Sequence, residues 1–474
     1  MMIENVLKQH KDNIALSDAK GTVLTYGILE QKSAELFKVI GKRTLVFSFC
    51  KNEVGSVLGY ITFLRYHIVP VLLNAEIETE LRQQLIEIYE PAFLYLPEEM
   101  TEVFSNYERV WESYGYCLLR TSYAMEKTMY QELGLLLTTS GSTGSPKLVR
   151  QSYKNILSNA ESIAEYLELT ADEKPISTLP MNYTYGLSII NSHLLVGAEI
   201  LLTDEPMTSR FFWEFFRQNK ATSFGGVPFT YEMLKKLRFF QMELPSLRYM
   251  TQAGGKLSPE LHREFANYAK NTEKKFIVMY GQTEATARMA YLPSERSLEK
   301  YGSMGIAIPH GRLWLKDVDD NQIKEPDIVG ELVYEGENVT LGYAECLSDL
   351  AKEDERHGVL QTGDMAKMDA DGYFYIVGRK KRFLKVYGNR VNLDEVERMI
   401  KRKFEQIECA CAGVDDHLYV FVTTNQENIH KQIRKFLADK TGLNAKAYAV
   451  KYVMEIPKND AGKTLYHKLE KYYD

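Results

Sequence analysis

The sequence predicts an α/β protein of more than one domain, with doubly wound sheets first and a small α+β domain last. The chain has 474 residues, and a single hydrophobic core stops growing at roughly 250–300 residues. Short apolar runs alternate with amphipathic stretches over residues 40–290, as in sheets that carry helices on both faces. From about residue 305 to 378 shorter β-type runs replace this alternation, and the charged segment 378–382 leads into the last domain.

Six apolar runs predict the buried strands of the first part, in chain order. They are residues 44–49, 68–73, 92–96, 133–137, 199–203 and 275–280. Between them lie helical stretches such as residues 155–167, where apolar side chains recur on one face. Farther along, residues 369–372 have the composition of a hairpin turn ahead of a strand at 373–377.

Composition excludes several classes of protein. The 45% hydrophobic and 26% charged fractions are typical of globular domains. The first residues lack the apolar core of a signal peptide, and the longest apolar stretch, 185–202, contains polar residues, so we expect no membrane span. Five cysteines in so long a chain indicate a reducing compartment, and Cys409 and Cys411 lack the partner pair of a zinc site. We therefore expect a cytoplasmic protein with structural thiols.

Charge is unevenly distributed along the chain. Residues 380–474 hold 19 Lys and Arg against 13 Asp and Glu, a charge of +6, whereas the whole chain carries −6. A basic last domain can attract an anionic partner such as a phosphorylated thiol carrier, although a solvated lysine-rich surface explains the same charge. No dense basic run with interleaved aromatic residues is present, so we expect no nucleic-acid partner.

The most informative stretch follows the apolar run 133–137. It reads Thr139, Ser140, Gly141, Ser142, Thr143, Gly144, Ser145, Pro146 and Lys147. Glycines let a backbone approach a polyphosphate, hydroxyl and N–H groups donate hydrogen bonds to it, and the lysine adds charge. The stretch is not a Walker A loop, because no Gly-Lys-Ser/Thr follows the first glycine at the required spacing.

This loop resembles the phosphate loop of the adenylate-forming superfamily, which comprises acyl-CoA synthetases, peptide-synthetase adenylation domains and firefly luciferase. Five further segments resemble that family's motifs in the family's order: 252–256, 280–286, 361–364 with Gly378 and Arg379, 384–391, and 457–463. The resemblance covers about residues 20–465. It is specific for the superfamily and uninformative about the acid that is activated.

The resemblance implies the full fold and its division. Residues 1–380 would form a large N-terminal domain of two doubly wound α/β subdomains plus a small β-barrel-like subdomain, which binds ATP and the acid. Residues 381–474 would form a small, mobile α+β lid domain that carries Lys463. Lys381 falls at the family's hinge position. Lys385 and Gly388 belong to the segment that enters the site for the thiol half-reaction.

The resemblance also implies a site, residue by residue. The nucleotide-binding residues would be Thr139, Ser140, Gly141, Ser142, Thr143, Gly144, Lys147, Gly254, Gly255, Lys256, Tyr280, Gly281, Gln282, Asp364 and Arg379. The catalytic residues would be Lys463, Thr283 and Glu284. Of these, Thr283 would meet the α-phosphate, Glu284 would bind Mg²⁺ as a hard oxygen ligand, and Lys463 would reach the carboxylate and the α-phosphate. Asp364 would accept the ribose hydroxyls.

The acyl pocket is the least determined part. The implied lining residues are Tyr183, Gly186, Val227 and Phe229, with Gly281 nearby. Three positions depart from the family's usual residues: Leu148 stands for a glycine, Tyr153 for a histidine, and Tyr183 at the position of a gate. Residues 175–198 contain no Asp or Glu, and burying an unpaired ammonium is costly, so an α-amino acid is disfavoured.

The function implied is that of an AMP-forming acid–thiol ligase. It would use ATP and Mg²⁺ to convert a small carboxylic acid to acyl-AMP and pyrophosphate. It would then transfer the acyl group to CoA or to the phosphopantetheine of a separate acyl carrier protein. Two alternatives stay open: an amino-acid or D-alanyl carrier-protein ligase, and a non-catalytic acyl- or nucleotide-binding homologue.

Overall fold

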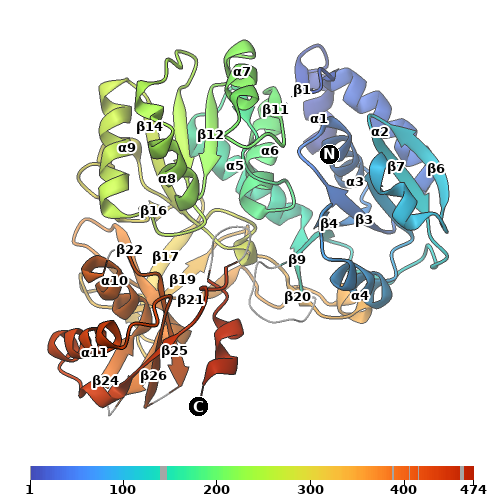
Figure 1. Cartoon of the computed structure of the whole chain (residues 1–474). Coiled ribbons are helices and arrows are strands. Elements are labelled where there is room, and N and C mark those ends of the chain that lie inside the picture. The colour runs from blue at the N-terminus through green and yellow to red at the C-terminus, as the bar shows by residue number, and fades with distance from the viewer. Residues whose placement is uncertain are drawn as a thin grey trace. The chain divides into compact units, whose positions relative to one another are not determined.

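The structure, a computed structural model, describes residues 2–138, 147–386, 389–404, 406–414, 416–458 and 464–473. These residues fold into two compact units. The first contains residues 2–138, 147–313 and 334–360. The second contains residues 314–333 and the described residues from 361 onward. Both are mixed α/β, which confirms the predicted fold class, and Figure 1 labels their elements.

Within the described ranges, the first unit contains two large sheets. Sheet 1 has the strand order β16-β15-β14-β13-β12-β10-β11-β1-β2. Its strands, in that order, are Ile306–Ala307, Ala290–Tyr291, Lys275–Tyr280, Tyr249–Gln252, Ser223–Gly226, Pro175–Ile176, Ile200–Leu202, Ile14–Asp18 and Val23–Thr25. Strands β14, β13, β12, β10, β11 and β1 run parallel to their neighbours within this series.

Sheet 2 has the order β20-β9-β8-β4-β3-β5-β7-β6. Its strands are Gly342–Ala344, Leu148–Ser152, Leu133–Thr138, Val69–Asn74, Leu45–Cys50, Phe93–Pro97, Tyr116–Arg120 and Glu108–Ser113. The centre of the sheet, β8-β4-β3-β5, is parallel. All six runs predicted to be buried strands are strands of these two sheets, so that prediction is confirmed.

Helices pack on these sheets. The α-helices of the first unit are α1 Met2–Gln9, α2 Tyr26–Ile40, α3 Val54–Arg65, α4 Thr79–Tyr89, α5 Tyr153–Leu167, α6 Thr184–Leu195, α7 Arg210–Gln218, α8 Pro228–Lys236 and α9 Pro259–Asn271. The short 3-10 helices are η1 Glu98–Phe104, η2 Phe239–Gln241, η3 Thr283–Ala285, η4 Ser294–Arg296 and η5 Leu347–Ala351. Helices α8 and α9 lie beside β12 and β14 (Figure 1). No helix within the described ranges has the length and apolar character needed to cross a membrane.

Helix α5 shows how the local sequence sets a boundary. The predicted helix at 155–167 is confirmed, but it begins two residues earlier. The Ser152 hydroxyl accepts from the Asn155 backbone N–H at 3.0 Å, and the Asn155 side chain accepts from the Ser152 N–H at 2.8 Å. This reciprocal capping satisfies two backbone donors that the helix leaves unpaired.

The second unit contains smaller sheets. The first has the order β18-β17-β19-β21-β22, formed by Gln322–Ile323, Arg312–Lys316, Gly330–Glu335, Val359–Met368 and Phe374–Arg379. The predicted hairpin at 369–372 joins β21 and β22 and is confirmed. Then follow η6 Lys380–Arg382, β23 Phe383–Val386, β24 Asn389–Asn392, α10 Leu393–Lys403, β25 Cys409–Val414, β26 His417–Val422, α11 Glu427–Thr441, η7 Ala445–Ala447, β27 Tyr448–Tyr452 and η8 Tyr466–Tyr472.

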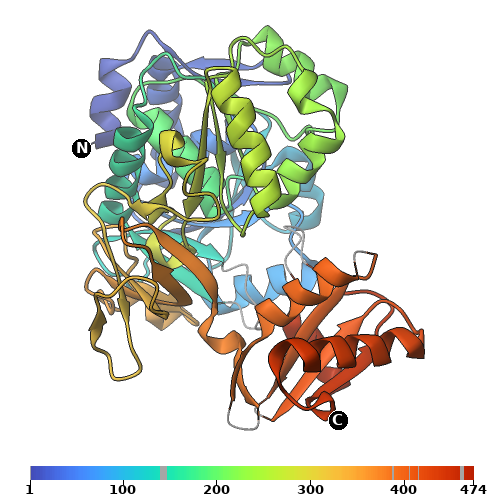
Figure 2. The same ribbon diagram turned by 90° about the vertical axis from the view of Figure 1, so that its left-hand side faces the viewer.

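Helices α10 and α11 pack on the sheet β25-β26-β27 (Figure 2). Cys409 and Cys411 are buried in β25 within this core, as expected of structural thiols. The proposed boundary between residues 380 and 381 stays a prediction.

One buried cation fastens β20 to the rest of sheet 2. Arg150 of β9 is fully buried, and its guanidinium donates to the backbone oxygens of Tyr343 at 3.0 Å and Leu341 at 3.1 Å. It also donates to the Lys352 oxygen and pairs with Glu355. A single side chain thus satisfies several carbonyls of the segment 341–355.

We expect Arg150→Met to lower the free energy of unfolding of the first unit by about 3 kcal/mol, because each carbonyl left buried without a donor costs about 1–3 kcal/mol. Differential scanning calorimetry measures the effect. The control is Arg312→Met, whose side chain is 62% exposed and which should change stability by about 0.5 kcal/mol or less. Equal shifts in the two variants would contradict this role of Arg150.

Candidate functional site

The candidate site lies where the parallel strands β12, β13 and β14 of sheet 1 end. Their registers place the carboxyl ends of the three strands at one edge, which is where open α/β sheets bind ligands. The segments that leave this edge begin at Val227, Ala253 and Gly281. Two of the predicted motifs, 252–256 and 280–286, are therefore brought side by side by the sheet.

Gly254 brings three of the predicted residues together. Its φ of +80° is unfavourable for residues with a Cβ. A Cβ at this position would lie 2.6 Å from the Tyr183 hydroxyl and 3.0 Å from a Val227 methyl group. Only glycine fits here, because Tyr183 and Val227 already occupy the space.

The segment after β14 is held tightly. A Cβ at Gly281 would lie 1.7 Å from the Ala287 oxygen, so the chain turns back closely on itself. Thr286 has a φ of +63°, and its hydroxyl donates to the Asn338 oxygen at 2.7 Å. The Asn338 amide donates to the Ala285 oxygen at 2.9 Å. These bonds fix η3, which carries Thr283 and Glu284.

Glu284 is the central acid of this segment. One carboxylate oxygen, Oε1, accepts a hydrogen bond from the Tyr343 hydroxyl at 2.7 Å. Its backbone oxygen accepts from the Thr340 N–H and from Arg356, each at 3.0 Å. Among the described residues, nothing bonds to the second carboxylate oxygen or to the Thr283 hydroxyl, so both are available to a ligand.

Tyr343 places two cations near that acid. The Lys147 ammonium lies 3.6 Å from the centre of the Tyr343 ring and the Arg356 guanidinium lies 4.6 Å from it. Burial, reinforced by the charge of Glu284, raises the pKa of Tyr343 to about 12. The tyrosine therefore stays a neutral donor to Glu284 at physiological pH. A carboxylate beside two cations is suited to bind a metal–phosphate group.

The model of the family described as AMP-binding enzyme matches residues 3–344. The chain belongs to the AMP-binding enzyme family.

Among relatives of this AMP-binding enzyme, sulfoacetate–CoA ligase of Cupriavidus necator is 30% identical over 291 residues, which are 60% of this chain and 55% of the relative. The 2-succinylbenzoate–CoA ligase of Bacillus mycoides is 26% identical over 360 residues, 74% of this chain and 72% of the relative. The chain spans 55–61% of the length of the first three curated relatives that it matches.

Solved structures show the same fold. O-succinylbenzoate coenzyme A synthetase from Bacillus subtilis in complex with AMP superposes with a TM-score of 0.78 at 20% identity, covering 99% of this chain and 98% of that one. ATP-bound MatB from Rhodopseudomonas palustris gives 0.77 at 20% identity, covering 100% and 98%. The AMP-binding enzyme fold therefore extends over the whole chain.

A second pair of predicted residues in this AMP-binding enzyme lies in the second unit. Asp364 of β21 and Arg379 of β22 face each other in the antiparallel ladder, with 3.3 Å between the Asp364 carboxylate and the Arg379 Nε. The side chain of Asp364 is 6% exposed and that of Arg379 is 67% exposed. The sequence predicted both residues, and the hairpin brings them together.

The remaining predicted residues have varied surroundings. The Gln282 amide donates to the Tyr280 hydroxyl at 3.0 Å. Gly255 and Lys256 are exposed. Gly186 packs on the backbone, since a Cβ there would lie 2.4 Å from the Pro180 oxygen. Phe229 is 59% exposed on α8, so its place in the acyl pocket stays a prediction without supporting contacts.

Several predicted residues lie outside the described part of the chain. They are Thr139, Ser140, Gly141, Ser142, Thr143, Gly144, Gly388 and Lys463. The backbones of Lys381 and Lys385 lie in η6 and β23, but their side chains are outside the described part.

The departures from the family pattern have structural explanations. Leu148, which stands for a glycine, is buried in β9 and pairs with Thr138 and Ala344. Strand β9, which the sequence analysis did not predict, separates the loop from helix α5. The Tyr153 hydroxyl accepts from Arg43 at 3.3 Å, so this tyrosine is anchored on sheet 2.

Sequence reasoning missed Tyr343, Arg356 and Thr340, which support Glu284. No motif among those recognised contained them, and all three come from a segment that lies 56–72 residues beyond Glu284. No local sequence signal indicates these contacts, because they depend on the pairing of β20 with β9.

We expect Tyr343→Phe to lower kcat/KM of this AMP-binding enzyme for its nucleotide by about 10–100-fold, as is typical when a partner that orients a metal ligand is lost. The hydroxyl that orients Glu284 is removed while the ring between Lys147 and Arg356 is kept. Steady-state kinetics at several Mg²⁺ concentrations measure the change. Tyr375→Phe in β22 is the control and should leave kcat/KM unchanged. An unchanged Mg²⁺ dependence in Tyr343→Phe would refute the role of Tyr343 in orienting Glu284.

Proposed function

We propose that the protein is an AMP-forming acid–CoA ligase. A carboxylate oxygen of the acid attacks the α-phosphorus of ATP. The bond between that phosphorus and the oxygen that bridges the α- and β-phosphates breaks, and pyrophosphate leaves. The thiol sulfur of CoA then attacks the acyl carbon, and AMP departs as the carbon–oxygen bond of the mixed anhydride breaks. The thiol proton is released to solvent.

The observation that carries this proposal is the environment of Glu284. One of its oxygens accepts from Tyr343 and the other has no partner among the described residues, while Lys147 and Arg356 lie against the same tyrosine ring. No cluster of three or more His, Cys, Asp or Glu suited to a metal occurs in the described ranges. A single carboxylate suits Mg²⁺, which binds through one or two carboxylates and the substrate's phosphates. Mg²⁺ held there would neutralise charge that develops on the phosphates.

The other residues then take the following parts. The loop 139–147 and Lys147 would hold the β- and γ-phosphates, and Thr283 would donate to the α-phosphate. Tyr280, Gln282 and the glycines at 254, 255 and 281 would border the adenine with Lys256. Asp364 would accept both ribose hydroxyls, with Arg379 beside it. Catalysis here is positioning and charge stabilisation, to which Lys463 would add a positive charge.

The second half-reaction would use the C-terminal domain, residues 381–474. This domain would turn about Lys381, withdraw Lys463, and present Lys385 and Gly388 to the thiol. CoA is favoured as acceptor over a carrier protein, because the relatives are named as CoA ligases of acids that range from oxalate to long-chain fatty acids. Five free cysteines support the cytoplasmic location that we propose.

An α-amino acid substrate is disfavoured by the charge of the pocket. Residues 175–198 contain no carboxylate, and the buried guanidinium of Arg288, a residue that is 2% exposed, donates to the Ser188 hydroxyl within this segment. An ammonium group placed beside a buried guanidinium would be repelled.

Pyrophosphate exchange with a panel of acids tests the proposal. An acid that drives ATP–pyrophosphate exchange, followed by thioester formation on addition of CoA, is the expected result. Thioester formation only with a purified carrier protein would replace CoA as acceptor. Nucleotide binding without exchange for any acid would instead identify a non-catalytic binding protein.

A further inference from the structure

Arg288 is a buried cation that has no part in the proposed binding of ATP and Mg²⁺. It lies four residues after Glu284, between η3 and β15, and is 2% exposed. A guanidinium stays charged at any physiological pH. Among the described residues, no Asp or Glu forms an ion pair with it, although burying an unpaired charge is expensive.

The hydrogen bonds of Arg288 go to neutral oxygens. Its Nε donates to the Ser188 hydroxyl at 3.1 Å and one Nη donates to the Tyr166 hydroxyl at 2.9 Å. The guanidinium also lies 5.3 Å from the centre of the Tyr185 ring. Within the described ranges, the second Nη has no acceptor. Two of five N–H donors are thus used, and the described part of the chain supplies no counter-ion for the positive charge.

Arg288 is one of the residues that line a small cavity between α6 and the strands of sheet 1. The cavity measures about 10 Å³ and is lined also by His193, Ser223, Tyr249 and Thr251. This is room for about one water molecule. Its walls carry hydroxyls and a ring nitrogen, so a polar ligand atom would meet hydrogen-bonding groups as well as the cation.

His193 adds no charge to this cavity. Its Nδ1 lies 2.8 Å from the Ile189 oxygen and donates to it, so Nε2 accepts from the Tyr249 hydroxyl at 2.7 Å. Burial lowers the pKa of His193 to about 3. The ring is neutral, and Arg288 supplies the positive charge.

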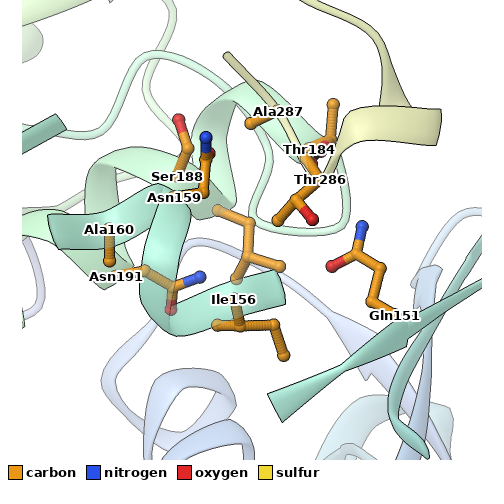
Figure 3. A pocket seen from close by; sticks show the side chains of 10 residues that line it. Gln151, Ile156, Asn159, Ala160, Thr184, Ser188, Asn191, Thr286 and Ala287 are labelled. Atoms are coloured by element: carbon orange, nitrogen blue, oxygen red, sulfur yellow. Dashed lines mark hydrogen bonds between the residues drawn. The ribbon is translucent and has the colours of Figure 1, made fainter. Parts of the chain in front are cut away.

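A second cavity of about 10 Å³ is lined by Ser188, the residue whose hydroxyl accepts from Arg288 (Figure 3). Asn159, which lines it, binds the Arg288 backbone oxygen at 2.9 Å. Gln151 also lines it, and both polar atoms of its side chain are buried without a partner among the residues that the structure describes. Arg288 thus lines one small cavity and bonds to two residues, Ser188 and Asn159, that line the other.

Aromatic residues connect this charge to the proposed acyl site. The Tyr185 hydroxyl would lie 2.9 Å from a Cβ at Gly225, in β12. The rings of Tyr183 and Tyr185 meet edge to face with centres 6.3 Å apart, and Tyr183 borders Gly254. The contacts therefore lead from Gly254 at the end of β13 through Tyr183 and Tyr185 to Arg288.

We propose that the acid substrate is a dicarboxylic acid whose second carboxylate binds Arg288. This inference rests on the proposed ligase function. The carboxylate remote from the reacting one would supply the missing counter-ion and accept hydrogen bonds from the unused Nη donors, with one of its oxygens in the water-sized cavity. A guanidinium binds a carboxylate through two parallel hydrogen bonds, which also fixes the orientation of the acid.

Matched acids of equal carbon number test the proposal: malonate against propionate, succinate against butyrate, glutarate against valerate, and adipate against hexanoate. ATP–pyrophosphate exchange should favour at least one dicarboxylate over its monocarboxylate partner by a factor of about 10² or more in kcat/KM, because a site built for a polar group rejects the analogue that lacks it. A preference for the monocarboxylate in every pair would overturn the proposal.

Variants of Arg288 make the test specific. In Arg288→Met the ratio of kcat/KM for the dicarboxylate to that for the monocarboxylate should fall by a factor of about 10². Arg288→Lys should keep part of this preference, because the charge remains. Arg210→Met, whose side chain is 88% exposed on α7, is the matched control and should keep the full preference. An unchanged preference in Arg288→Met would overturn the proposal. Should Arg288→Met fail to fold, the preference for dicarboxylates is measured in Arg288→Lys and in Ser188→Ala instead, and it should be smaller than in the wild type.

Thermal shift with the acids alone separates this inference from the proposed function. A dicarboxylate should raise Tm of the wild type more than its monocarboxylate partner, and this difference should shrink in Arg288→Lys. If no acid drives exchange while the shift difference persists, the ligase function fails and the anionic site stands. If exchange occurs without any preference for dicarboxylates, the ligase function stands and the anionic site is refuted.

Discussion

Replacing Glu284 by glutamine should lower the rate of acyl-adenylate formation by a factor of about 10²–10³. Glutamine has nearly the same shape, and its amide oxygen can still accept the hydrogen bond that Tyr343 donates to the Glu284 Oε1. What is lost is the negative charge and the available second oxygen, which are the features suited to Mg²⁺. The measurement is ATP–pyrophosphate exchange with the preferred acid over a range of Mg²⁺ concentrations.

Glu337→Gln is the control for this change. Its carboxylate is 59% exposed and pairs with Lys154, and we expect exchange to stay within about twofold of the wild type, as for other exposed ion pairs. Exchange by Glu284→Gln at the wild-type rate, with the same Mg²⁺ dependence, would falsify the assignment of Glu284 as the metal ligand.

Lys463→Ala should separate the two half-reactions. We expect acyl-AMP formation to fall by a factor of about 10²–10³, the usual scale for losing one group that stabilises charge in the transition state. Thioester formation from supplied acyl-AMP should be largely unchanged, because the proposed role of Lys463 ends once pyrophosphate has left. Exchange measures the first step, and release of AMP on addition of CoA measures the second.

Lys468→Ala serves as the matched variant for Lys463→Ala. Lys468 is exposed, five residues farther along the chain, and its loss should affect neither step. An equal loss of both half-reactions in Lys463→Ala would show that the C-terminal domain does not work in two arrangements. No effect on either step would remove Lys463 from the site.

The fold was largely predictable because its strands are short, apolar and bounded. The predicted strand at 275–280 coincides with β14, and that at 133–137 with β8 to within one residue. A strand buried on both faces needs side chains that are apolar at nearly every position, and this leaves a local signal. Strand β9 was missed, because Arg150 and Gln151 interrupt its apolar pattern.

The site was predictable only in part, because only the features that are local in the sequence leave a signal. Glycines at 254 and 281 and the acid Glu284 occur in compact motifs at strand ends, so the sequence indicates them directly. Tyr343 and Arg356 contact Glu284 from a distant segment. Nothing local to these two residues shows that contact, because it depends on the pairing of β20 with β9.

By itself, the sequence determined the fold class, the order of the motifs and the family to which the chain belongs. These follow from local periodicity and from residue types at short spacing. Both are properties of the sequence that do not depend on the folded structure. Only the tertiary structure decided which groups support Glu284 and where uncompensated charge is buried. Only when segments distant in the sequence pack together does the Tyr343 hydroxyl meet Glu284, and only then is Arg288 buried without an acidic partner among the described residues.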